Sequence, residues 1–419
     1  MRSKVTHKQH RAYRIQLKST SYLEDLCIRA KNLYNAATYL MRQDLFTTGN
    51  WLQYIALYQQ LKANPVYLAL KELTDSYIPQ QVLRQVEQVW RSYFKALKAY
   101  HQAPSSFQGR PRLPKYLPKD GRRLISFPRG RVRVRGASIL FPNNMLQRGF
   151  PTIPLRKFPF TPATTLSARL VPFYDRFVLE LIYEVSPSPT CLDPLLKRII
   201  GLDLGVNNLV ATSDGFLIKG GVIKTINQWY NKQLAKYRAL AAQNHHSSRT
   251  HRIIRLQRQR ANKLTDILHQ TSRALITHCQ TQQFDTIVVG YNPQWKHRCN
   301  LGKQNNQNFI QIPFLAFVQL VEYKAQQVGI QVVRKDEAYT SQQCSNCGIQ
   351  TPTNRRSRGL YQCRACALRL NADINAARNL RNTFLHSLSS LHLVLRDEVS
   401  FRKLFSPDSG GVTPPVQMS

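Results

Sequence analysis

Few of the charged residues are acidic. The 419-residue sequence holds 22 Asp and Glu against 60 Lys and Arg, a formal net charge of +38 at pH 7. This excess of positive charge predicts a polyanionic partner, with nucleic acid as the first expectation and an anionic membrane surface as the weaker alternative. Hydrophobic residues make up 42% of the chain, which excludes wholesale disorder. At roughly 100–200 residues per domain, the length predicts two to four domains.

Long apolar runs are absent as well. No segment approaches the ~18–20 consecutive apolar residues of a membrane-spanning helix. The N-terminal segment MRSKVTHKQHRAYRIQLKS is basic, but it lacks the apolar core of a signal peptide. We therefore expect neither secretion nor a place in a membrane.

Cysteines are few and unevenly placed, which favours a reducing compartment with one metal site over a disulfide framework. Four of the eight are scattered: Cys27, Cys191, Cys279 and Cys299. The other four form two CxxC pairs separated by 15 residues: Cys344, Cys347, Cys363 and Cys366. This spacing predicts a tetrahedral four-thiolate zinc site with sulfur about 2.3 Å from the metal, against the alternatives of disulfides or four unused thiols. All four ligand positions are filled by protein, so the zinc would be structural.

The segment from 21 to 100 is expected to be helical. Apolar residues recur at helical spacing over 21–42 and again from Val82 to Leu97. These stripes, with their Tyr and Trp residues, predict the packed seam of a small helical bundle rather than a base-stacking surface.

A basic, β-rich region follows. Residues 101–174 hold 14 Lys and Arg against one acid, Asp120. The segments TLSARLVPF and FVLELIYEV flank a short turn and predict a hairpin that ends near Val185. Together these features predict a strongly cationic β domain, such as a barrel.

Alternating Arg and Val over 131–135 predict a strand with a cationic face. In such a strand the valines, Val132 and Val134, would be buried on the other face. The density of positive charge favours a phosphate-binding surface over a merely solvated one. The arginines expected to bind nucleic acid are Arg122, Arg123, Arg131, Arg133 and Arg135.

After a Pro- and Ser-rich linker at 186–194 the pattern changes to a mixed α/β sheet. Strands are expected from 199 to 219, at 286–290 and at 330–335, and helices over 226–282, over 314–329 and from about 371. The polar stretch 290–309 could contact nucleic acid, form a lid or be an ordinary loop. Beyond about residue 404 a Ser-, Pro- and Gly-rich tail is expected to be disordered.

Two aspartates lie in unusual contexts. Asp203 interrupts the apolar strand IIGLDLGV, where a buried carboxylate needs a cation or hydrogen-bond donors, and the flanking glycines Gly201 and Gly205 allow close approach. Its alternatives are a solvated strand face or a turn cap. Asp373, in NADINAARNL, could instead cap the following helix, as could Asn371.

These motifs resemble, in order and spacing, the TnpB proteins encoded by insertion sequences, which are compact relatives of type V CRISPR effectors. The resemblance rests on IIGLDLGVNNLVATSDG, KLTDILHQTS, EAYTSQQCSNCG, YQCRAC and NADINAARNL, is strong over about 196–383, and extends to the N-terminal half only in layout. It implies an α/β multidomain protein with a RuvC-like, ribonuclease H-type nuclease domain over 196–340 and 367–395. A zinc ribbon at 341–366 interrupts this domain, and basic residues within it, Arg355, Arg356 and Arg358, would face nucleic acid.

The resemblance also implies what precedes the nuclease domain. A β-barrel wedge domain of residues 1–20 and 101–190 and a helical recognition lobe of residues 21–100 would hold guide RNA and double-stranded target DNA. The expected location is the prokaryotic cytoplasm, in association with the nucleoid.

Catalysis in this family implies three carboxylates around two Mg²⁺ or Mn²⁺ ions, since these hard cations need oxygen ligands. Asp203 matches the first acidic motif and Asp373 the third. The second motif departs from the family, because Gly290 stands where members usually carry Glu, and no acid occurs from 286 to 321. Asp285 precedes the strand and is therefore at the wrong end.

Two interpretations of this departure stay open. In a rearranged site, Glu337, or less plausibly Asp336, supplies the missing carboxylate from the end of the next strand. This arrangement resembles that of some members of the family. The chain would then be an RNA-guided, metal-dependent DNA endonuclease associated with a transposable element. Otherwise the site is inactive, and the protein is an RNA-guided DNA-binding regulator or transposition accessory. A transposase acting directly on transposon ends is a weaker third hypothesis.

Overall fold

The computed structural model describes residues 9–154, 166–185, 198–244, 250–292, 302–336, 341–357 and 359–404, with side chains described up to 388. The chain divides into two compact units. The first comprises residues 1–187 with 241–258, and the second comprises 188–240 with 259–419. Among the described residues, we find no helix with the length and apolar character that crossing a membrane requires.

Four helices follow the first strand of unit 1: α1 (Ser21–Thr48), α2 (Tyr54–Leu61), α3 (Pro65–Leu73) and α4 (Tyr77–Gln102). The side chain of Thr20 caps the start of α1 by accepting a hydrogen bond from the Leu23 backbone N–H at 3.3 Å. Gly49, with φ of 74°, ends the helix in the left-handed conformation that glycine adopts without strain. The helices expected around 21–42 and 82–97 are therefore confirmed, as α1 and α4.

An antiparallel six-stranded sheet completes unit 1, in the order β1-β6-β5-β2-β3-β4. Its strands are β1 (Gln9–Lys18), β2 (Ile125–Arg135), β3 (Ser138–Leu140), β4 (Ile153–Pro154), β5 (Leu166–Phe173) and β6 (Arg176–Val185). A short 3₁₀ turn (Pro104–Ser106) and α5 (Asn143–Gln147) lie in the connections. The predicted hairpin is β5 and β6. Closure into a barrel stays a prediction.

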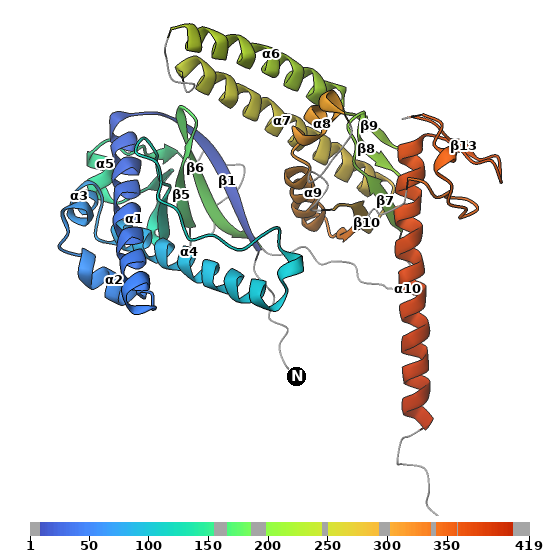
Figure 1. Cartoon of the computed structure of the whole chain (residues 1–419), viewed down its shortest axis with the longest axis horizontal. Coiled ribbons are helices and arrows are strands. Elements are labelled where there is room, and N and C mark those ends of the chain that lie inside the picture. Colours follow the sequence, from blue (N-terminus) through green and yellow to red (C-terminus); the bar gives the residue numbers. More distant parts are fainter. Residues whose placement is uncertain are drawn as a thin grey trace, which may run out of the picture. The chain divides into compact units, whose positions relative to one another are not determined.

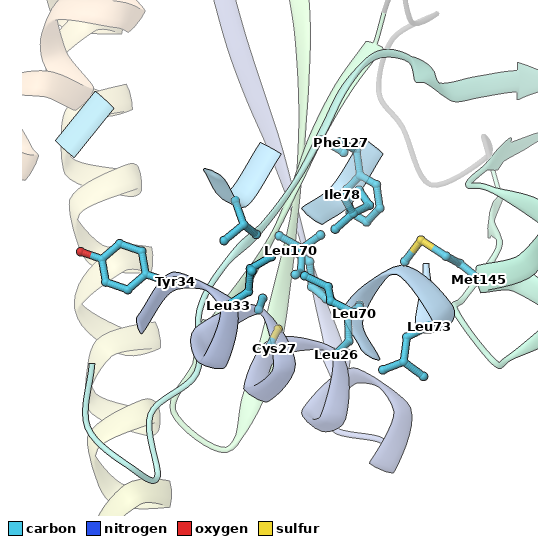
Figure 2. Close-up of a cluster of buried hydrophobic side chains, with 14 of the residues drawn as sticks. Leu26, Cys27, Leu33, Tyr34, Leu70, Leu73, Ile78, Phe127, Met145 and Leu170 are labelled. Atoms are coloured by element: carbon cyan, nitrogen blue, oxygen red, sulfur yellow. The ribbon is translucent and has the colours of Figure 1, made fainter. Parts of the chain in front are cut away.

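Helices and sheet of unit 1 share one apolar core. Leu26 and Cys27 of α1, Leu70 of α3, Phe127 of β2 and Leu170 of β5 point into the same buried cluster (Figure 2). The helical stripe recognised in the sequence is thus buried against the sheet as well as against other helices.

One detail of the cationic strand is corrected. Val132 is buried, as expected, but Val134 is 42% exposed. Among the described residues, the pairing of β2 with β5 ends at Val132↔Leu166, and beyond it β2 pairs with the short β3. Val134 therefore lies beyond the described pairing of β2 with β5.

Unit 2 is built on a five-stranded sheet in the order β11-β10-β7-β8-β9. Its strands are β7 (Ile199–Asp203), β8 (Asn208–Thr212), β9 (Leu217–Lys219), β10 (Thr286–Gly290) and β11 (Gln331–Lys335). The pairs β7–β10 and β10–β11 are parallel, whereas β7–β8 and β8–β9 are antiparallel. The expected mixed α/β sheet is confirmed.

The helices of unit 2 are α6 (Gly221–Gln243), the greater part of α7 (His251–Thr281), α8 (Lys303–Ile310), α9 (Phe314–Gln327) and α10 (Ala372–Leu404). Between β11 and α10 lie a 3₁₀ turn (Pro352–Asn354) and the two-stranded β12 (Tyr361–Gln362) and β13 (Arg369–Leu370). Figure 1 shows β13 beside the start of α10. The polar stretch 290–309 contains the helix α8, while its residues 293–301 lie outside the described part. The predicted linker at 186–194 and the tail after 404 lie outside it too.

Candidate functional site

The two predicted aspartates come from β7 and α10, which cross each other. Asp203 is the last residue of β7, and Asp373 is the second residue of α10. The crossing is tight at Gly201, where an added Cβ would lie 1.9 Å from the backbone oxygen of Ala377. A second glycine, Gly205, is also constrained, since a Cβ there would lie 2.8 Å from the Asn208 backbone oxygen, and 4.0 Å from Asp373 Oδ2. Both glycines of the GLDLG motif are therefore required by close approach.

Asn371, rather than Asp373, caps α10. The Asn371 side-chain oxygen accepts hydrogen bonds from the backbone N–H groups of Asp373, at 2.9 Å, and Ile374, at 3.4 Å. The carboxylate of Asp373 is thereby available for other contacts. Asn208 Nδ2 donates to its Oδ2 at 2.8 Å, and Arg355 Nη2 lies 3.9 Å from its Oδ1.

The charged groups around Asp203 change its pKa. Burial, followed by the nearby Asp373 carboxylate, raises the pKa of Asp203 well above its usual range, and Arg355 opposes the rise. Two carboxylates held together, with the partly exposed guanidinium of Arg355 beside them, form a site that favours added positive charge. This donor set fits a divalent cation that prefers oxygen ligands, such as Mg²⁺ or Mn²⁺.

Strand register locates the position of the missing second acid. Val289 of β10 is level with Leu202 of β7, so Gly290 lies at the same sheet edge as Asp203. Asp285 lies at the opposite edge, where its Oδ2 accepts a hydrogen bond from the Arg198 backbone N–H at 2.8 Å. On the far side of β10, Gly290 pairs with Lys335, and exposed Asp336 follows directly. Glu337 lies outside the described residues, so its role stays a prediction.

The four clustered cysteines meet as expected for a metal site. Their sulfur atoms all lie within 4.8 Å of one another, and the pairs Cys344–Cys366 and Cys347–Cys363 are 3.6 Å apart. Tetrahedral zinc with 2.3 Å bonds requires sulfur–sulfur separations of about 3.8 Å. The backbone N–H of Leu368 is the main group that lowers the pKa of Cys366 to about 6, which favours its thiolate. The residues present therefore fit one structural zinc ion.

Asparagines of α10 join this ribbon to the site, a feature that sequence reasoning missed. Asn375 and Asn379 both donate to the Gln343 backbone oxygen at 2.7 Å. The Asn375 side-chain oxygen accepts from the Ser345 backbone N–H at 3.0 Å, and Asn382 donates to the Ser345 oxygen at 3.3 Å. The signal was present as asparagines at i, i+4 and i+7 along a helix. The helix that carries Asp373 thus also holds the first cysteine knuckle.

In unit 1, Arg122 and Arg123 make contacts within the protein. Arg122 Nη1 donates to Glu24 Oε1 at 2.8 Å, and its other terminal nitrogen donates to the backbone oxygen of Tyr174. The guanidinium of Arg123 lies 3.9 Å from the ring centre of Tyr34, and burial lowers its pKa. Both residues support the fold, and a role in binding nucleic acid stays a prediction.

The arginines of β2 differ in exposure. Arg131 Nη1 lies 3.4 Å from Asp75 Oδ2, and its guanidinium lies 3.4 Å from the ring centre of Tyr77. Arg133 and Arg135 are exposed. Of the three, these two have the accessibility that a phosphate contact requires.

Two family models match the chain, mostly within unit 2. Residues 182–296 match a family described as a probable transposase, and residues 314–380 match the Cas12f1-like TNB domain. The second match runs from α9 through the cysteine cluster into α10.

Curated relatives match about half of the chain. The CRISPR-associated endodeoxyribonuclease Cas12f1 of Sulfoacidibacillus thermotolerans is 29% identical over 218 residues, 49% of this chain and 50% of its own. The putative RNA-guided DNA endonuclease InsQ of Escherichia coli (strain K12) is 27% identical over 197 residues, 43% of this chain and 48% of its own. The TnpB-like protein ORF457 of Acidianus two-tailed virus is 26% identical over 200 residues, 45% of this chain and 42% of its own. The chain thus spans about half the length of the curated relatives it matches.

Solved structures align over more of the chain but at low identity. A cryo-EM structure of a Cas12f1–sgRNA–target DNA complex covers 89% of this chain and 99% of its own, with a TM-score of 0.35 and 16% identity. The mini-RNA-guided endonuclease CRISPR-Cas_phi3 covers 89% and 92%, with a TM-score of 0.48 and 11% identity.

Proposed function

Because this chain is a TnpB-family protein related to the type V effectors, we propose that it is an RNA-guided, divalent-metal-dependent DNA endonuclease associated with a transposable element. The observation that carries the proposal is the meeting of Asp203 and Asp373 at the crossing of β7 and α10, where burial and the neighbouring Asp373 carboxylate raise the pKa of Asp203. The relatives named as DNA endonucleases support the class of activity.

Asp203 and Asp373 would hold the metal through their carboxylate oxygens. Bound there, Mg²⁺ or Mn²⁺ would supply activation of a water nucleophile and stabilisation of the leaving oxygen of a phosphodiester. Asn208 keeps one oxygen of Asp373 oriented, and the Asn371 cap leaves the carboxylate available. Arg355, which comes from the zinc ribbon and lies 3.9 Å from Asp373 Oδ1, would contact a phosphate oxygen of the bound substrate.

Glu337 is proposed as the third carboxylate. It follows Lys335 by two residues, and Lys335 pairs with Gly290, the position where family members usually carry Glu. A carboxylate just beyond the end of β11 would approach the same sheet edge as Asp203. The metal requires an oxygen at the right place, whichever strand supplies it.

The expected partners are guide RNA and double-stranded target DNA. Base pairing would select the sequence, while the protein would contact heteroduplex shape and backbone. The net charge of +38 and the exposed Arg133 and Arg135 support a large phosphate-binding surface. The wedge and recognition roles of the β domain and the helices of unit 1 belong to the same proposal.

The test begins with sequencing of RNA that co-purifies with the protein. A library of DNA targets matching that RNA is then incubated with and without Mg²⁺. Cleavage that needs both the RNA and the metal is the expected result, and Asp203→Asn should abolish it. Absence of any bound RNA would contradict the proposal.

The rearranged site needs its own variants. Glu337→Gln should abolish cleavage and leave target binding intact, whereas the neighbouring Asp336→Asn serves as a matched control and should cut normally. Normal cutting by Glu337→Gln would show that this residue is not a metal ligand.

One observation, the glycine at position 290, supports a second candidate function without nuclease activity. With two carboxylates at the described site, the protein could instead bind guided targets without cutting them. In that case target occupancy would persist, and neither Mg²⁺ nor Mn²⁺ would give cleavage by the unmutated protein.

A further inference from the structure

The helices α6 and α7 begin within a segment that lacks acidic residues. Residues 215–265, which include α6 and the first half of α7, contain 11 Lys and Arg and no Asp or Glu. Solubility alone does not require the exclusion of one sign of charge over 51 positions. Such a segment attracts phosphates and carries no carboxylate to repel them.

A surface cleft opens between α6, α7 and α8 within this unit. Its volume is about 440 Å³, which lies in the range of small-ligand sites. The residues that line it are Tyr230, Asn231, Leu234, Ala235, Arg238, Arg260, Gln307 and Gln311. Four of the five α6 members follow i, i+3, i+4 and i+7 spacing from Asn231 to Arg238, so they form one face of that helix.

Arg260, one of the lining residues, is held in a fixed orientation. Its Nε donates to Asn227 Oδ1 at 2.8 Å, and its Nη2 donates to the Gln311 backbone oxygen at 3.3 Å. Its guanidinium lies 4.8 Å from the ring centre of Tyr230, which is itself buried. A guanidinium held in this way loses little side-chain entropy when it binds a phosphate.

The remaining lining residues supply amides and a small apolar surface. Asn231 and Gln311 donate to each other through their side-chain amides, at 3.2 and 2.9 Å. Gln307 is exposed on α8, and Arg238 is exposed on α6 at the other end of the lining face. Leu234 and Ala235 lie between Asn231 and Arg238 on the lining face of α6. The cleft therefore combines two cations, amide groups and an apolar strip.

We propose that this cleft binds one nucleotide of a single-stranded nucleic acid segment. Arg238 and Arg260 contact its phosphate, the apolar strip at Leu234 and Ala235 contacts the sugar or base, and Gln307 hydrogen-bonds a base edge. A polymer is favoured over a free nucleotide because the acid-free charge continues along α6, at Lys224 and Lys232. This inference rests on the proposed function, since it assigns to the RNA-guided protein a strand-binding site apart from Asp203 and Asp373.

The test compares two cations on the same helix. Arg238→Ala removes an exposed charge from the lining face, and Lys236→Ala removes an exposed charge that lies about 160° away from Arg238 around α6. Binding of a fluorescent single-stranded oligonucleotide is measured over a range of salt, in separate RNA and DNA arms. Arg238→Ala should weaken binding about ten-fold and reduce the slope of log K against log salt by about 0.7, more than Lys236→Ala does.

Position is tested independently by crosslinking. Photoactivated 4-thiouridine RNA or 4-thiothymidine DNA should attach to peptides containing residues 230–238 or 307–311, and Arg238→Ala should reduce the yield. The arm that crosslinks more strongly identifies whether the strand is RNA or DNA. Unchanged circular dichroism for both variants shows that the comparison concerns binding rather than folding.

The outcomes separate the two proposals. Equal affinities and salt slopes for Arg238→Ala and Lys236→Ala, or crosslinks elsewhere in the chain, would overturn the proposal that the cleft binds a nucleotide. The proposed function would still stand if the wild type cleaves guided targets. A wild-type protein with no bound RNA and no guided target binding would overturn the proposed function itself.

Discussion

Replacing Gly201 by alanine tests how β7 and α10 create the site. The added Cβ would lie 1.9 Å from the Ala377 backbone oxygen, whereas ordinary contact begins at 3.4 Å, so α10 must retreat by about 1.5 Å. The contacting atom is backbone, so a side-chain rotation cannot relieve the clash. We expect the free energy of unfolding to fall by about 1–3 kcal/mol, as overpacked sites show.

The same displacement of α10 should also reduce the rate of DNA cleavage, and by a large factor. Asp373 begins the helix that moves, and a shift of about 1 Å at a catalytic group can cost about 100-fold in rate. Urea unfolding and guided DNA cleavage at saturating Mg²⁺ measure the two effects. Gly221→Ala is the matched control, because a Cβ there meets nothing within 4 Å. Wild-type stability and cleavage for Gly201→Ala would refute the described crossing.

Three further predictions follow from the carboxylate site, the ribbon and a buried lysine. Asp203→Asn should raise the unfolding free energy of metal-free protein by about 1 kcal/mol at neutral pH and by less at acid pH, because a carboxyl with a raised folded-state pKa loses its stabilising effect as pH rises through that pKa. Urea titrations at both pH values measure the difference, and an equal gain in stability at both would contradict the prediction. By elemental analysis, the purified protein should contain one zinc ion per chain, and the variant Cys344→Ser should contain almost none and cleave guided targets at least about ten-fold more slowly. Full cleavage by the zinc-free variant would show that the carboxylate site does not depend on the ribbon. Burial lowers the pKa of Lys324 to about 8, so above that pH the unfolded state binds more protons than the folded state. In urea unfolding at alkaline pH, the stability of the wild type should therefore rise by up to about 1 kcal/mol per pH unit relative to Lys324→Met. A stability difference between the two proteins that stays constant with pH would exclude the lowered pKa.

Local patterns predicted most of the fold. The apolar stripe of α1, the β5–β6 hairpin and the three-strand meander from Ile199 depend on near neighbours in sequence, which periodicity reports directly. The cysteine tetrad was predictable for a similar reason, since each knuckle is a local spacing. Val134 was mispredicted because its exposure depends on where β5 ends its pairing with β2.

The site was only partly predictable. Asp203 and Asp373 stand out as carboxylates in apolar or helix-start contexts, but their approach depends on α10 crossing β7 over residues far apart in sequence. The internal contacts of Arg122 with Glu24 and of Arg123 with Tyr34 are likewise long-range. A count of positive charge cannot distinguish such arginines from exposed ones, such as Arg133.

The asparagine face of α10 has a consequence for domain exchange between relatives. A ribbon transplanted alone into another sheet would bring its cysteines but leave behind Asn375 and Asn379, the side chains that receive its first knuckle. The Gln343 carbonyl would then lose two donors at once. A chimera that keeps the ribbon together with the first three turns of its own helix should assemble, whereas one joined at Asn371 should not.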